Sequence, residues 1–195
     1  MSSPSTTLLT PAEYLALERK AGVRSEYIAG RIFAMSGASR RHNLIAGNLH
    51  GEIRAQLRGR ACEAYVSDMR VKVNPTGMYT YPDIVAVCGE PRFEDASVDT
   101  LLNPMLLAEV LSESTEAYDR GEKFAHYRRL ETLREYVLVA QDKIRIEHYR
   151  REGEQWILSE ISDPDSTLHL ASIDCHIALA AIYEKVDLNP LPAHQ

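Results

Sequence analysis

Two apolar runs decide the fold of this chain: residues 81–88, which read YPDIVAVC, and residues 105–111, which read MLLAEVL. Continuous apolar runs of this length are typical of strands that are covered on both faces. Asp83 opens the first run, and Glu109 interrupts the second. Burying a carboxylate in such a strand costs on the order of several kcal/mol unless a cation, a basic side chain or an opening to solvent compensates it. If the two strands are neighbours in one sheet, the two carboxylates converge on one point.

Converging carboxylates suggest a metal site. Hard cations such as Mg²⁺ are commonly held by one or two carboxylates together with water and substrate phosphate. Such an ion polarises the phosphate and lowers the pKa of a bound water, which is the minimal equipment for phosphodiester hydrolysis. Simpler interpretations stay open, because an Asp after Pro often makes a turn hydrogen bond and a lone strand Glu often pairs with an arginine.

On the N-terminal side of these runs the sequence predicts two helices and a hairpin. The segment Thr10-Pro11-Ala12-Glu13 can cap and open a helix that ends at Gly22. Two short strands, 25–28 and 31–35, flank a turn at residues 29–30. Residues 39–57 predict a long helix with one apolar face, because apolar side chains recur every four residues at Ile45, Leu49, Ile53 and Leu57.

Strands dominate the rest of the chain. We expect them at 62–66, 70–73, 81–88, 105–111, 136–140, 143–149 and 155–161, with helices at 116–130 and 177–185 and a turn at 74–77. This order predicts an α/β (α+β) fold with one mixed β-sheet flanked by helices. We expect a single domain over residues 10–188, with flexible termini at 1–9 and 189–195.

Composition narrows the class of protein. The chain has 195 residues, 45% hydrophobic and 26% charged, and a formal net charge of -6. That charge argues against a protein that coats nucleic acid electrostatically, but not against a metal-dependent nuclease whose acids hold a cation. No segment approaches the ~20 apolar residues of a membrane helix, and the polar start does not resemble a secretory signal. We therefore expect a cytoplasmic protein without membrane contact.

The cysteines are Cys62, Cys88 and Cys175. They are far apart, odd in number and never spaced as a CxxC pair, which argues against a disulfide framework or a zinc site. We expect all three to be reduced and mostly buried.

Several segments together carry a family resemblance: residues 26–32 (EYIAGRI), the helix opening at His42, 81–87 (YPDIVAV), 103–112 (NPMLLAEVLS), 119–123 (DRGEK) with Tyr127, and 135–139 (EYVLV). With these pieces in order, nearly the whole chain resembles the Uma-type restriction endonuclease family, within the PD-(D/E)XK nuclease superfamily. The resemblance implies a restriction-endonuclease-like core in which Asp83 and Glu109 hold Mg²⁺ or Mn²⁺.

One position departs from the superfamily pattern, which has a lysine two residues after the second acid. Here that position is Leu111. A side chain at 111 shares the strand face of Glu109, so a lysine there would point into the site. The resemblance suggests Lys123 as the replacement, because a long stem on the following helix can reach back. The alternative for Lys123 is an ordinary i,i+4 pair with Asp119 on an exposed helix face.

Three more residues are candidates. The resemblance suggests Glu26 as a third acid, against the alternative of an exposed strand residue. His42 is either a buried, hydrogen-bonded histidine or a group near the substrate phosphate. Tyr127 either positions Lys123 or simply packs in the core, and core packing is the interpretation we favour.

Three hypotheses follow. The first is a Mg²⁺- or Mn²⁺-dependent endonuclease with Asp83, Glu109, Lys123 and Glu26 as catalytic residues and DNA as the expected partner, acting as a homodimer because duplex cleavage needs two sites. The second is a non-catalytic binding module of the same fold, whose carboxylates are satisfied by arginines. The third is a homodimeric structural protein with an interface in residues 137–146.

Overall fold

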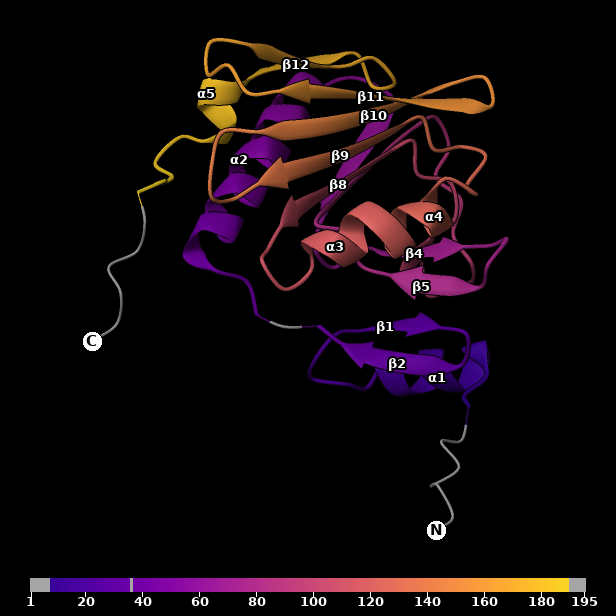
Figure 1. The fold of residues 1–195 in the computed structure, drawn as a ribbon. Coiled ribbons are helices and arrows are strands. Elements are labelled where there is room, and N and C mark those ends of the chain that lie inside the picture. The colour runs from indigo at the N-terminus through magenta and orange to yellow at the C-terminus, as the bar shows by residue number, and fades with distance from the viewer. Residues whose placement is uncertain (1–7, 36, 190–195) are drawn as a thin grey trace, which may run out of the picture.

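The computed structural model describes residues 8–35 and 37–189, and its centre is a six-stranded sheet in the order β11-β10-β9-β8-β6-β3 (Figure 1). Its strands are β3 (Cys62–Val66), β6 (Ile84–Cys88), β8 (Leu106–Leu111), β9 (Glu135–Ala140), β10 (Ile146–Glu152) and β11 (Gln155–Ile161). The pair β8–β9 is parallel and the other pairs are antiparallel, so the sheet is mixed.

A second, five-stranded sheet has the order β2-β1-β5-β4-β7. Its strands are β1 (Ser25–Ile28), β2 (Arg31–Ala34), β4 (Arg70–Val73), β5 (Met78–Thr80) and β7 (Thr100–Leu101). A two-stranded ladder, β12 (Thr167–Leu170) with β13 (Cys175–Ala178), and α5 (Leu179–Ile182) follow the last strand of the large sheet.

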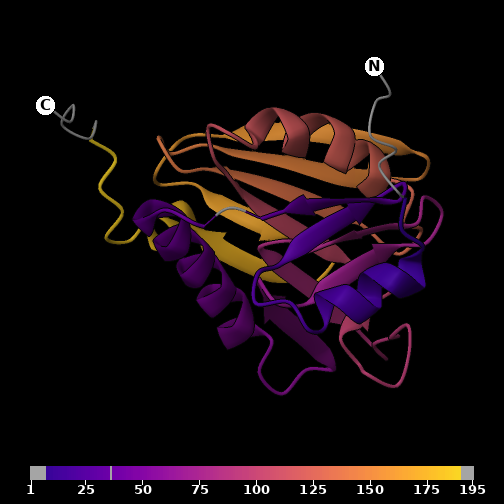
Figure 2. The same ribbon diagram turned by 90° about the horizontal axis from the view of Figure 1, so that it is seen from below.

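Helices cover both faces of the large sheet (Figure 2). One face packs against α2 (Arg40–Gln56), whose Ile45, Leu49 and Ile53 join a cluster with the ladder and α5. The other face packs against the second sheet and a helical segment formed by α3 (Glu116–Tyr118), a π-helical turn (Asp119–Lys123) and α4 (Phe124–Tyr127).

The alternation of side chains along β6 and β8 determines which residues reach the second face. Ile84 and Ala86 point to the α2 core, whereas Val85 and Val87 point to the opposite core. In β8, Leu107 and Leu111 also join that opposite core. Because strand residues two apart share a face, Asp83 and Glu109 belong to the side covered by the π-turn.

Most of the predicted elements are confirmed. The fold class is α+β with mixed sheets between helices, and the first helix, α1 (Pro11–Glu18), has the expected capping box between Thr10 and Glu13. The hairpin and the long helix also lie where the patterns place them.

Other predictions are wrong in part. The expected last helix at 177–185 begins inside β13 and is helical only over Leu179–Ile182, because Ile177 alternates inward with Cys175 as a strand does. The expected helix at 116–130 contains the π-turn and ends at Tyr127. The expected strand at 143–149 starts at Ile146 instead, and the expected strand at 81–88 starts at Ile84. The sequence patterns predict none of the strands β5, β7 and β12.

The prediction of three reduced cysteines is wrong for two of them. Cys62 and Cys88 form a disulfide, and only Cys175 is free and buried. The reason is register, because antiparallel pairing of β3 with β6 puts Cys62 directly opposite Cys88. A sequence separation of 26 residues hides that neighbourhood.

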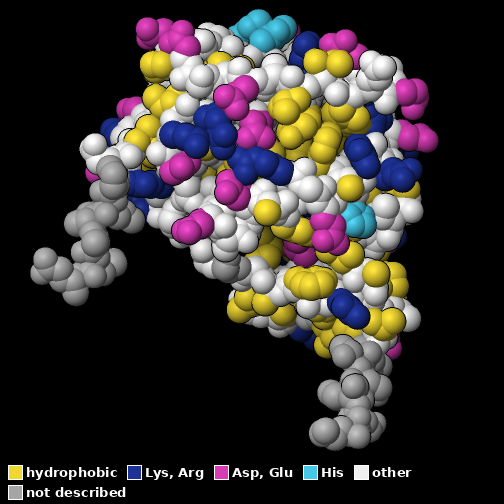
Figure 3. Space-filling model, in the orientation of Figure 1, with side chains coloured by type: hydrophobic (Ala, Val, Ile, Leu, Met, Phe, Trp, Pro, Cys, Tyr) yellow, Lys and Arg dark blue, Asp and Glu magenta, His cyan; other side chains and the backbone are white. Residues whose placement is uncertain are grey.

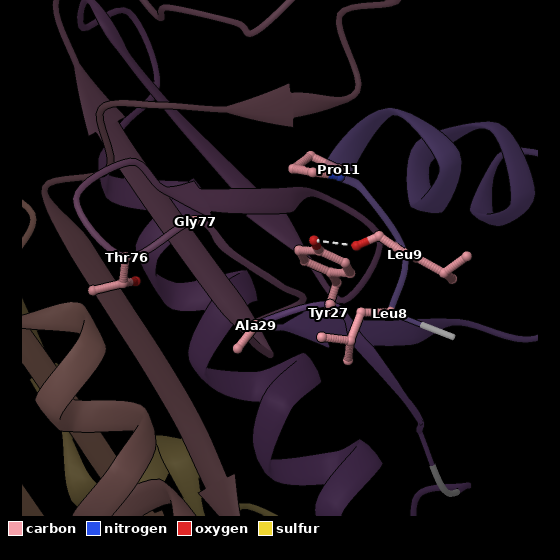
Figure 4. A pocket seen from close by; sticks show the side chains of 8 residues that line it. Leu8, Leu9, Pro11, Tyr27, Ala29, Thr76 and Gly77 are labelled. Atoms are coloured by element: carbon pink, nitrogen blue, oxygen red, sulfur yellow. Dashed lines mark hydrogen bonds between the residues drawn. The ribbon is translucent and has the colours of Figure 1, made fainter. Parts of the chain in front are cut away.

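The N-terminal helix is tied to the hairpin beside a small hollow of about 310 Å³ (Figure 4). There the Tyr27 hydroxyl donates to the Leu9 carbonyl at 2.8 Å, and the Leu9 amide donates to Gly30. The hollow is lined without carboxylate, imidazole or amine groups, so we assign it no chemistry.

The sequence also predicts flexible termini and no membrane-spanning helix. Residues 1–7 and 190–195 of the predicted flexible termini lie outside the described residues. Within the described ranges, no helix combines the length and apolar character needed to cross a bilayer.

Candidate active site

Asp83 and Glu109 lie side by side, because β6 and β8 are antiparallel neighbours that place Ile84 opposite Ala108. The Asp83 amide donates to Glu109 Oε2 at 3.2 Å. The Val110 amide donates to Asp83 Oδ2 at 2.7 Å, so this carboxylate bonds across to the next strand rather than closing a turn. The two acids from distant parts of the sequence therefore form one pair.

Lys123 reaches the same point from the π-turn. Its ammonium lies 2.8 Å from Glu109 Oε1, 3.1 Å from Glu26 Oε1 and 3.6 Å from Asp119 Oδ1. The predicted i,i+4 contact with Asp119 is thus present, but Lys123 is 5% exposed and does not sit on a solvent-facing helix. Leu111 meanwhile packs in the core beneath the helix.

Glu26 is a buried member of the cluster rather than an exposed strand residue. It enters from β1, which lies next to β5 in the second sheet. Its carboxylate accepts hydrogen bonds from Thr80 and, at 3.0 Å, from the Tyr118 hydroxyl. Two sheets and the π-turn therefore all contribute to one site.

His42 and Tyr127 complete the surroundings. His42 Nε2 lies 3.0 Å from Asp83 Oδ2, and both side chains keep about one-sixth of their surface exposed at 16% and 15%. The Tyr127 hydroxyl donates to Glu109 Oε1 at 2.9 Å, and the ring is fully buried. Tyr127 thus packs in the core as expected and also holds the second acid.

Burial and the nearby charges shift the pKa values of the residues in this cluster. Burial raises the pKa of Glu109 to about 8, and the charges of Asp83 and Asp119 add to the rise while Lys123 opposes it. Burial likewise raises the pKa of Asp83 and of Asp119. Burial alone would lower the pKa of Lys123, but its carboxylate partners, Glu109 first, raise it well above the ordinary value.

The residues present fit a divalent cation. Three carboxylates, those of Glu26, Glu109 and Asp119, share one buried lysine, and Asp83 lies beside them against His42. Among the described residues no arginine pairs with Asp83 or Glu109, and Asp83 Oδ1 has no hydrogen-bond partner there. The Asp83 side chain is 15% exposed and lies beside Glu109, so the pair offers the one or two carboxylates that commonly hold Mg²⁺ or Mn²⁺ together with water.

Sequence reasoning missed three members of this network. Asp119 was considered only as a surface partner of Lys123, and Thr80 and Tyr118 were not considered. The signal for Asp119 was its position four residues before the lysine, since that spacing places both side chains near one another on a helix. The hydroxyls of Thr80 and Tyr118 carry no local signal.

The model of the Uma2 family, described as "Putative restriction endonuclease", matches residues 11–180. The chain belongs to the Uma2 family. Two relatives of the chain come from Synechocystis sp. (strain ATCC 27184 / PCC 6803 / Kazusa). "Uncharacterized protein sll1609" is 39% identical over 168 residues, covering 86% of this chain and 95% of the relative. "Uncharacterized protein slr1290" is 36% identical over 184 residues, covering 93% and 95%.

A solved structure has the same fold as this Uma2 chain. It is described as the "Crystal structure of a putative nuclease belonging to DUF820 from Anabaena variabilis ATCC 29413 at 1.96 A resolution". The two superpose with a TM-score of 0.73 over 90% of this chain and 97% of that one, at 20% identity. At that identity the likeness establishes the fold of the Uma2 chain and not its chemistry.

Proposed function

We propose that this Uma2 protein is a divalent-metal-dependent nuclease that hydrolyses phosphodiester bonds in nucleic acid, with DNA as the substrate. The observation that carries the proposal is the convergence of Asp83 and Glu109 with Lys123 in one buried, acid-rich cluster. The family description and the fold of the neighbouring nuclease support the same class of reaction.

Each residue has a distinct role in this proposal. Asp83 and Glu109 would hold Mg²⁺ or Mn²⁺, which when bound polarises the phosphate and acidifies water. Lys123 stabilises negative charge that develops on the phosphate. Glu26 positions Lys123, since the ion pair between them is 3.1 Å long. His42 positions Asp83, and Tyr127 positions Glu109.

The non-catalytic alternative predicts carboxylates satisfied by arginines. Among the described residues no arginine pairs with Asp83 or Glu109, contrary to that expectation. Titration of Mn²⁺ by calorimetry separates the two without any assumption about substrate. We expect the wild type to bind and Asp83→Asn and Glu109→Gln to lose binding, with Glu90→Gln, an exposed acid elsewhere, as the matched control.

Cleavage of labelled DNA and RNA oligonucleotides then tests the reaction. Asp83→Asn, Glu109→Gln and Lys123→Ala should each lose at least about a hundredfold in rate, and chelation of metal should abolish cleavage. Undiminished cleavage in the acid variants would refute the assignment. Absence of both Mn²⁺ binding and cleavage in the wild type would favour the binding module.

We also propose that the protein acts on duplex DNA as a homodimer, since two strands require two sites. Residues 137–140 and Ile146 are buried in the chain's own core, so a dimer would use another surface than the predicted interface at 137–146. Light scattering gives the mass that tests this, and a monomer bound to its cleaved duplex would contradict it.

A cytoplasmic location is part of the same proposal, because that is where a nuclease meets cellular and invading DNA. Fractionation of cells followed by immunoblotting tests this location, and recovery of the protein outside the cytoplasmic fraction would contradict it.

A further inference from the structure

A cleft unrelated to the acid cluster lies between α4, the turn after it, and the ends of β10 and β11. Its volume is about 890 Å³. Four arginines line it, at positions 128, 129, 134 and 151, against two glutamates at 131 and 154. Figure 3 shows dark blue basic side chains beside a yellow apolar patch on this side of the molecule. In a chain of net charge -6, this is a local excess of positive charge.

The four arginines of the cleft outnumber its two glutamates. Among the described residues none of the four forms a salt bridge, and Arg151 instead donates to the main-chain carbonyls of Arg128 and Glu131. Burial and the neighbouring charge of Arg134 together lower the pKa of Arg151. Clustered guanidinium groups without carboxylate partners provide a site for an anion such as phosphate.

The inner wall of the cleft is aromatic. Phe124 packs on Tyr149 with ring centres 4.4 Å apart and on Trp156 at 5.3 Å. The Arg151 guanidinium lies 4.8 Å from the centre of the Trp156 ring. Tyr149 and Trp156 are only partly buried, so both pack against the core and still line the cleft.

Arginines beside aromatic side chains in one cleft match the chemistry of a single nucleic-acid strand, because phosphates pair with guanidinium groups and unpaired bases stack on aromatic rings. A duplex hides its base faces and cannot use the rings in this way. We infer that this cleft binds a single-stranded segment of nucleic acid. The inference rests on the proposed nuclease function and adds a second, separate contact surface. Phe124 directly follows Lys123, so one helical segment serves both places.

Trp156 is the only tryptophan of the chain, so its fluorescence reports on the cleft. The experiment titrates full-length protein with a single-stranded oligothymidylate in the presence of a metal chelator, so that no cleavage occurs. We expect Trp156 fluorescence to be quenched on binding. Titration over the same concentrations with a blunt-ended duplex that has no single-stranded segment should quench the Trp156 fluorescence far less.

Charge variants locate the binding. Arg129→Ala/Arg134→Ala should weaken binding at least tenfold and reduce the salt dependence of log K by about 1.4, which is ~0.7 for each lost phosphate contact. The matched control is Arg54→Ala/Arg58→Ala, which removes two exposed arginines of the α2 end and should leave affinity within twofold. Both variants change the net charge equally.

The outcomes separate this inference from the nuclease proposal. Quenching that depends on Arg129 and Arg134 supports the cleft even if the wild type never cleaves DNA. Absence of binding, binding without quenching, equal quenching by duplex, or equal losses in the two double variants would each overturn the inference, and none of them bears on cleavage or on Mn²⁺ binding at Asp83 and Glu109.

Discussion

Replacing Lys123 by methionine tests how the acid cluster is held together. The lysine is 5% exposed and its ammonium pairs with Glu109 at 2.8 Å and with Glu26 at 3.1 Å. Methionine keeps much of the side-chain volume but leaves both carboxylates without their cation. Removing one partner of a buried ion pair costs about 3–5 kcal/mol. We expect the lower end, about 3 kcal/mol, because Tyr127 and Tyr118 still donate to these carboxylates.

The assay is urea unfolding in metal-free buffer above pH 8, where Glu109 with its pKa of about 8 is ionised, followed by Trp156 fluorescence. Lys143→Met, at an exposed position, is the control and should change the free energy of unfolding by less than about 0.5 kcal/mol. The double variant Lys123→Met/Glu109→Gln should recover at least ~1 kcal/mol of the loss, because glutamine needs no cation. A single variant as stable as the control would refute the view that Lys123 compensates the buried acids.

Three other measurements test features away from that lysine. The pKa of Glu109 in the folded state is raised from its ordinary 4.5 to about 8, so between these pH values the folded state binds a proton that the unfolded state has lost. The free energy of unfolding should therefore fall as pH rises through this range. Glu109→Gln should flatten that fall in metal-free buffer, and an unchanged slope would contradict the assignment. Reducing the Cys62–Cys88 disulfide, which spans 26 residues, should lower the free energy of unfolding by about 3–4 kcal/mol, whereas an unchanged urea midpoint would show that the crosslink does not restrict the unfolded chain. Burial opposes ionisation of Glu135, but its hydrogen bonds, that from His148 foremost, lower its pKa below 4.5. The stability that this gives is present above pH 4.5 and is lost in more acidic solution. Glu135→Gln should therefore lower the free energy of unfolding at neutral pH and reduce the acid sensitivity of the fold, as acid titrations followed by circular dichroism would show.

The two acids could be predicted because their signal is local. Asp83 and Glu109 stand out as charges within apolar runs, and strand alternation places both on one face once β6 and β8 pair. Lys123 and Glu26 were predicted through the family resemblance rather than from spacing, since nothing near them in sequence marks them as buried.

What the sequence does not reveal depends on long-range register. The Cys62–Cys88 bond follows from pairing between β3 and β6, which no local pattern encodes. The π-turn over Asp119–Lys123 lies in a stretch whose composition suits an ordinary α-helix. The short strand β13 was mistaken for a helix because its few inward residues, such as Ile177, fit either periodicity.

In the site we propose, the basic group lies on a helical segment, whereas the superfamily pattern places it on the strand of the second acid. Leu111 then fills the core, and the residue that carries the ammonium group lies outside the pairing of β8 with β9. A sequence search that requires a lysine two residues after the second acid would miss this chain and any other chain that carries the lysine on the following helical segment. Recognition by the three-dimensional position of the ammonium group would find them.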